Sequence, residues 1–128
     1  RIKVVERRRF PRFLTQVKAY FPGDPTGYSV KNISWRGLFI KTPHKFNLEN
    51  RLIYFELEIP EIGRIPIYGY IVHQGTDKEP GLGIEIIEID KDLGPVWGLY
   101  IKALNFLKEA RDEYERRLKK QTEQSQEG

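Results

Sequence analysis

The sequence contains no cysteine, and this absence excludes several kinds of chemistry. Without cysteine there is no disulfide framework, no thiolate metal site and no cysteine nucleophile. Such a composition suits a reducing compartment, and we expect a cytoplasmic protein. The chain also has no run that approaches the roughly eighteen apolar residues of a transmembrane helix, so we expect no membrane span.

Histidine is scarce, and the two that are present do not form a metal-binding pattern. His44 follows a proline and His73 ends an apolar run, so they lack the spacing of a metal pair. Glu56 and Glu58 lie two apart, but two carboxylates on an exposed strand are far more often a solvated surface than an acid/base pair. Because Gly-rich phosphate loops and nucleophile elbows are also missing, we expect a non-catalytic protein without metal or cofactor.

The positive charge is concentrated at the start of the chain. The formal net charge is +4, yet residues 1–12 carry +5 by themselves and the rest of the chain sums to −1. This segment contains one acidic residue, Glu6, and six basic residues, which are Arg1, Lys3, Arg7, Arg8, Arg9 and Arg12. Phe10 and Pro11 lie inside the block, which favours an arm that docks over a solvated tail. A localised basic arm indicates an anionic partner.

Residues 13–90 have the pattern of one small all-β domain. Residues 51–59 alternate between apolar and polar positions, as a half-buried strand does. Residues 64–74 are apolar on both faces, so we expect that strand to be covered on both sides. Clusters of turn residues separate six strand-like segments, which are 13–21, 28–34, 38–40, 51–59, 64–74 and 82–89. Six short strands at this spacing predict a closed antiparallel β-barrel, because an open sheet would leave edges to protect.

After residue 90 the apolar period becomes helical. Asp90 or Asp92 can cap the helix. Apolar residues then recur at steps of four and three, with Arg111 interrupting the stripe formed by Leu93, Trp97, Tyr100, Leu104, Leu107, Tyr114 and Leu118. We expect a long C-terminal helix over 91–120 that crosses the barrel with its first half. Its charged second half either projects into solvent or pairs with another copy, which gives a candidate homo-oligomer interface over 93–118. We expect the polar tail 121–128 to be disordered.

Two short segments carry the chemistry of a ligand site. The guanidinium groups of Arg8 and Arg12 can bind phosphate bidentately, stack on purines and read the guanine edge. Asn32 and Ser34 are two apart on a predicted strand, so both can face a base edge or ribose. Gly37 permits a positive φ and the close approach of a ligand. Together these residues predict a site for a ligand that carries phosphates and base edges.

The spacing Arg8-x-x-x-Arg12, followed by Asn32-x-Ser34-x-x-Gly37, resembles the signature of the PilZ domain. PilZ domains are bacterial receptors for the second messenger cyclic di-GMP. The segment 81–86 also resembles the family's last strand, and the similarity runs from about residue 6 to residue 107. The resemblance implies a six-stranded antiparallel β-barrel with a C-terminal helix, in agreement with the pattern above.

The resemblance also implies a set of ligand-binding residues, namely Arg7, Arg8, Arg12, Asn32, Ser34 and Gly37. The paired arginines would hold phosphate and stack on guanine, and the turn would hold a guanine edge. Arg7, just before the motif, is associated in this family with a stacked ligand dimer, so we expect two ligands per chain. Asn32 stands where Asp is commoner, and we expect weaker pairing with the guanine N1/N2 edge because an ionised Asp only accepts hydrogen bonds.

The sequence leaves three functions open. The first is a cyclic di-GMP sensor that changes conformation and signals to a protein effector, which in this family belongs to flagellar, pilus, exopolysaccharide or transcription machinery and hence to motility and biofilm formation. The second is a PilZ-like assembly module that binds ligand weakly or not at all and oligomerises through its helix. The third is a single-stranded nucleic-acid binder, which the acidic strand carrying Glu56 and Glu58 disfavours.

Overall fold

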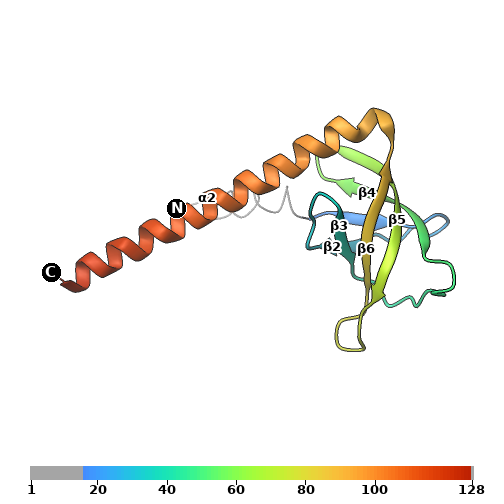
Figure 1. Cartoon of the computed structure of the whole chain (residues 1–128), viewed down its shortest axis with the longest axis horizontal. Coiled ribbons are helices and arrows are strands. Elements are labelled where there is room, and N and C mark those ends of the chain that lie inside the picture. The colour runs from blue at the N-terminus through green and yellow to red at the C-terminus, as the bar shows by residue number, and fades with distance from the viewer. Residues whose placement is uncertain (1–15, 128) are drawn as a thin grey trace.

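Figure 1 shows a small β-barrel from which one long helix projects. The computed structural model describes residues 16–127, with side chains as far as residue 123, so Arg7, Arg8 and Arg12 of the basic arm lie outside the described residues. The six strands are β1 (Lys18–Tyr20), β2 (Tyr28–Lys31), β3 (Gly37–Ile40), β4 (Leu52–Ile59), β5 (Gly63–Gln74) and β6 (Leu82–Ile89). A short 3-10 turn, η1 (Lys91–Leu93), leads into the helix α2 (Gly94–Glu127).

The strands close into a barrel in the order β1-β2-β3-β6-β5-β4, and every neighbouring pair is antiparallel. The predicted fold class, a six-stranded antiparallel barrel with a long C-terminal helix, is therefore confirmed. Closure pairs both edges of each strand, which removes the free edges that an open sheet of this size would expose.

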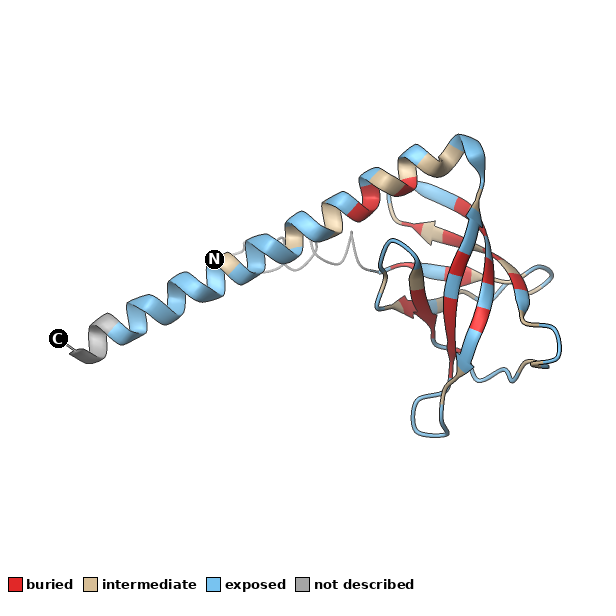
Figure 2. Cartoon of the chain, viewed as in Figure 1, coloured by how far each residue is buried: buried red, intermediate tan, exposed pale blue. Residues whose placement is uncertain are grey.

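The alternation within β4 shows how the sequence builds the barrel core. Ile53, Phe55, Leu57 and Ile59 are buried inside the barrel, and the residues between them face outwards. The same alternation of buried and exposed positions runs along β5 in Figure 2. Strand residues point alternately to the two sides of a sheet, so period-two apolar residues all reach the interior.

The expectation that β5 is covered on both faces is wrong. Tyr68 is 56% exposed, and Tyr70 and Val72 are also exposed on the outside of the barrel. Barrel closure buries only the inner face, and within the described residues no element covers this part of the outer face. Tyr68 packs instead against Tyr54 of the neighbouring strand β4, with ring centres 5.0 Å apart.

The first turns of α2 complete the core at one side of the barrel. Asp90 caps η1 by accepting a hydrogen bond from the Asp92 amide at 2.9 Å, as expected for this pair. Trp97, Tyr100 and Ile101 are buried among the barrel residues. Beyond them the helix leaves the barrel, and Figure 2 shows its second half exposed.

The end of α2 differs from the prediction. The structure continues the helix to Glu127, so the predicted helix end at residue 120 and the predicted disorder of residues 121–127 are wrong, and residue 128 lies outside the described residues. Residues 121–127 contain no glycine or proline, and the glutamine and glutamate residues among them have good intrinsic helix propensity, so nothing ends the helix there. Within residues 16–127, no helical stretch combines the length and the apolar character needed to span a membrane.

Candidate functional site

The predicted ligand residues Asn32, Ser34 and Gly37 lie on the turn that joins β2 to β3. The sequence analysis placed Asn32 and Ser34 on one face of a strand, but strand β2 ends at Lys31 and both residues lie in the turn. Asn32 has a φ of 55°, in the left-handed region. Asparagine is among the few residues that adopt this conformation readily, because its short polar side chain can hydrogen-bond locally. The residue type at position 32 therefore has a structural reason as well as a chemical one.

Ser34 closes the turn through hydrogen bonds with Gly37. The Ser34 amide donates to the Gly37 carbonyl at 2.8 Å, and the Gly37 amide donates to Ser34 Oγ at 3.1 Å. The Ser34 hydroxyl also lies 3.3 Å from the Gly37 carbonyl oxygen. The side chain is exposed, and a hydroxyl has a second lone pair, so a ligand donor can still reach it.

Gly37 is not needed for its backbone conformation. Its φ is outside the left-handed region, so the expectation of a positive φ is wrong. A β-carbon at this position would lie 3.4 Å from the Ile84 carbonyl oxygen and 3.6 Å from Ser34 Oγ, which is ordinary contact. The described neighbours thus leave room for a methyl group. Close approach by a ligand remains a reason for glycine here.

The turn is attached to α2 by two tryptophans. The indole Nε1 of Trp97 donates to the backbone carbonyl of Trp35 at 3.3 Å. The ring of Trp35 lies beside Gly98, where a β-carbon would be 3.8 Å from it, and the Trp35 side chain is 56% exposed. The hydrogen bond from the buried Trp97 side chain therefore holds the turn at a fixed place on α2.

A groove of about 590 Å³ lies between this turn and α2. Its volume is within the range of small-molecule sites, roughly 300–1,000 Å³. One wall runs from Val30 to Trp35, and the other is the face of α2 between Tyr100 and Arg111. The polar residues of the groove come from both walls, and they are Lys31, Asn32, Ser34, Asn105, Lys108 and Arg111.

Three of these polar residues come from α2, and sequence reasoning did not identify any of them as ligand-binding. Arg111 was visible only as the residue that interrupts the apolar stripe. Lys31, on the other wall, forms an ion pair with Glu79, and this contact lowers the pKa of the Glu79 carboxyl. The groove therefore offers uncharged hydrogen-bonding groups at the turn and cationic groups on the helix.

The other acidic and histidine candidates have structural partners. Arg64 pairs with Glu56 at 3.4 Å and with Glu58 at 3.3 Å, and its guanidinium lies 4.0 Å from the ring centre of Tyr20. His73 packs against Phe39, with ring centres 6.2 Å apart. These contacts agree with the surface role expected for the two carboxylates.

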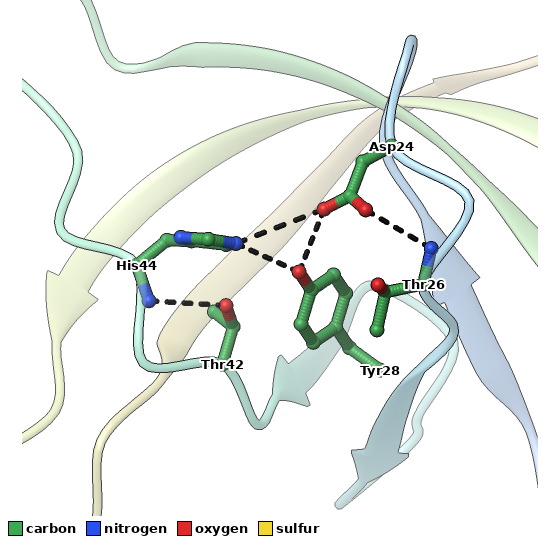
Figure 3. A network of polar contacts seen from close by, with 5 residues as sticks. All are labelled: Asp24, Thr26, Tyr28, Thr42 and His44. Carbon is green, nitrogen blue, oxygen red and sulfur yellow. Dashed lines mark hydrogen bonds and ion pairs between the residues drawn. The ribbon is translucent and has the colours of Figure 1, made fainter.

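A second polar cluster joins the loop between β1 and β2 to the loop that follows β3 (Figure 3). The Tyr28 hydroxyl donates to Asp24 at 2.6 Å and lies 2.7 Å from His44 Nε2. Asp24 also accepts from the Thr26 amide at 3.0 Å. The hydrogen bond from Tyr28 lowers the pKa of the Asp24 carboxyl, and the same bond raises the pKa of Tyr28. The sequence analysis did not identify this cluster, and the Asp-x-Thr spacing of Asp24 and Thr26 in a turn is the signal that could have indicated it.

Comparison with known proteins agrees with the signature and the fold. The family model described as PilZ domain matches residues 6–94, which include Arg7, Arg8 and Arg12 of the basic arm and the turn at 32–37. No curated protein matches the chain. The match covers well over half of the sequence and the whole of the barrel. The chain therefore belongs to the PilZ domain family, whose members are receptor domains for cyclic di-GMP.

Proposed function

We propose that this chain binds cyclic di-GMP and acts as a non-catalytic sensor. The observation that carries the proposal is the groove between the signature turn and α2, which has the size of a small-molecule site and exposes the side chains of Asn32 and Ser34. The family membership supplies the ligand class. Binding by the basic arm is part of the proposal and rests on its sequence.

Each signature residue has a role that follows from its chemistry. Arg8 and Arg12 neutralise the ligand phosphates and stack on guanine, because a guanidinium combines a planar hydrogen-bonding fork with a flat face. The Asn32 amide and the Ser34 hydroxyl hydrogen-bond a guanine edge. Gly37 leaves space for the ligand beside the turn. An amide in place of the commoner carboxylate weakens the interaction with guanine N1 and N2.

The proposed mechanism is an ordering of the arm over the ligand. Bringing three arginines together is unfavourable until phosphates neutralise them, so ligand binding shifts the arm towards the turn. The change presents a new surface to a protein effector. With Arg7 in place, the site takes a stacked pair of ligands.

Calorimetric titration of the chain with cyclic di-GMP tests this proposal. We expect saturable binding of two ligands per chain, and no comparable binding of GMP or cyclic GMP. Arg8→Ala and Arg12→Ala should each weaken binding strongly, since a hydrogen bond to a charged group contributes about 1.5–3 kcal/mol. Unchanged affinity in both variants would refute the role of the arm.

A second candidate function is assembly through α2. The helix carries exposed apolar side chains along its length, and these are Leu99, Phe106, Tyr114 and Leu118. They could pack against a second copy with ligand binding weak or lost. Analytical ultracentrifugation separates the two functions. A stable oligomer that dissociates when the chain is truncated at Arg111, and does not respond to cyclic di-GMP, would favour assembly.

A further inference from the structure

The face of α2 that lines the groove carries two basic residues, Lys108 and Arg111, with no established role. They continue the helical stripe that is buried closer to the barrel. Tyr100 is buried, Leu104 and Leu107 are half-buried, and Arg111 follows at the next step of the same stripe. Residues three and four apart lie on one side of a helix, so Arg111 points towards the turn side where an apolar residue would be expected.

The charges of these two residues are not neutralised within the described part of the chain. Lys108 and Arg111 make no hydrogen bond or ion pair there, although both are on a helix rich in glutamate. By contrast, Arg116 and Arg117 both pair with Glu113, at 2.6 and 2.7 Å. The two arginines further along the helix are thus paired with a glutamate, whereas the two cations that line the groove have no ion-pair partner among the described residues.

The opposite wall of the groove provides the groups that would hold a base. Asn32 and Ser34 are exposed there, and Trp97 fixes the turn at one place on α2 through the carbonyl of Trp35. A nucleotide seated on the turn would have its phosphates within a groove whose second wall is cationic. Phosphate is bound well by arginine in a bidentate manner and by lysine as a point charge.

We propose that Lys108 and Arg111 of α2 are ligand-binding residues that contact the phosphates of the dinucleotide, so that the ligand bridges the barrel turn and the helix. This inference rests on the proposed function, because it assigns further residues to the same site. It makes α2 one wall of the binding site. Ligand occupancy then acts directly on the helix that projects from the barrel.

The test is calorimetric titration of the full-length chain with cyclic di-GMP in matched helix variants. Arg111→Gln should weaken binding about tenfold, which corresponds to about 1.4 kcal/mol, and the double variant Lys108→Gln/Arg111→Gln should weaken it further. Arg111→Lys keeps the charge but loses the planar fork, so its affinity should fall between those of the wild type and Arg111→Gln. Arg116→Gln is the control, because it removes the same charge from the same helix and leaves Glu113 paired with Arg117.

Salt dependence gives a second readout, which a purely structural role would not change. The tenfold difference in affinity between the wild type and Arg111→Gln should shrink when the ionic strength rises from about 0.1 M to about 1 M, because the Debye length then falls from about 10 Å to about 3 Å. If the wild type binds and both Arg111→Gln and the double variant bind equally well, the inference is wrong and the proposed function stands. If the wild type shows no binding, the proposed function fails and this inference fails with it.

Discussion

The hydrogen bond between Trp97 and the turn leads to a prediction that can be worked out in numbers. Trp97 is only 1% exposed, and its indole donates to the Trp35 carbonyl at 3.3 Å. In Trp97→Phe this bond is lost, which costs about 0.5–1 kcal/mol because the bond is long and water can reach the exposed turn. The smaller ring also leaves a cavity on the order of 40 Å³, which adds about 1 kcal/mol at about 24 cal/mol per Å³.

The sum, about 1.5–2 kcal/mol, should lower the melting temperature by about 6–8 °C for a chain of this size. Trp35→Phe is the matched control, because it makes the same substitution at an exposed side chain and keeps the backbone carbonyl that Trp97 uses. Thermal unfolding followed by circular dichroism measures both. The chain has two tryptophans, so each variant keeps a single fluorescent tryptophan. The buried Trp97 that remains in Trp35→Phe should emit at a shorter wavelength than the exposed Trp35 that remains in Trp97→Phe. Equal melting temperatures for the two variants would refute the structural role given to Trp97.

Three further predictions concern single side chains. Burial raises the pKa of Tyr100 to about 12, so the stability that neutral Tyr100 contributes is complete below about pH 10 and is lost as the pH rises towards about 12. In alkaline denaturation, Tyr100→Phe should lack this loss, while Tyr114→Phe, which changes an exposed tyrosine, should behave as the wild type. The hydrogen bond from Tyr28 lowers the pKa of the Asp24 carboxyl, so the stability that ionised Asp24 contributes is present above about pH 4 and is lost below it. The stability of Asp24→Asn should therefore depend less on pH during acid unfolding than that of the wild type. Gly37→Ala should change the melting temperature by less than about 2 °C, since its added methyl has ordinary contacts, while calorimetry should show weaker cyclic di-GMP binding.

Periodicity was enough to predict the barrel and the docked part of the helix. The strict alternation in β4 leaves one register that buries Phe55 and Leu57, and the stripe from Trp97 to Leu104 selects one face of α2. These patterns are strong because burial acts on every second strand residue or on one side of a helix. The outer face of β5 shows the limit of such reasoning, since Tyr68 and Tyr70 are exposed there and Tyr68 packs sideways against Tyr54 of β4.

The candidate site was predicted less completely than the fold. The signature identified Asn32, Ser34 and Gly37 but did not predict the turn geometry, because an alternating sequence pattern does not show at which residue the hydrogen bonds between two strands end. The contribution of α2 was hidden for a different reason. Arg111 breaks an apolar stripe, and only the position of the turn opposite the helix shows that the break faces a groove.

The structure also separates the residues around the turn that the fold alone accounts for from those that it does not. Asn32 has a left-handed backbone and Ser34 closes the turn, so a barrel that had lost its ligand would still favour both residues. Gly37 has no such requirement among its described neighbours, and Lys108 and Arg111 lack partners among the described residues. The fold gains nothing from placing these two cations on the side of the helix that faces the turn, because like charges three residues apart on one helix face repel. Two cations on the groove wall opposite the turn, together with a signature glycine that the backbone conformation does not require, therefore favour ligand binding more than the asparagine and serine of the signature do.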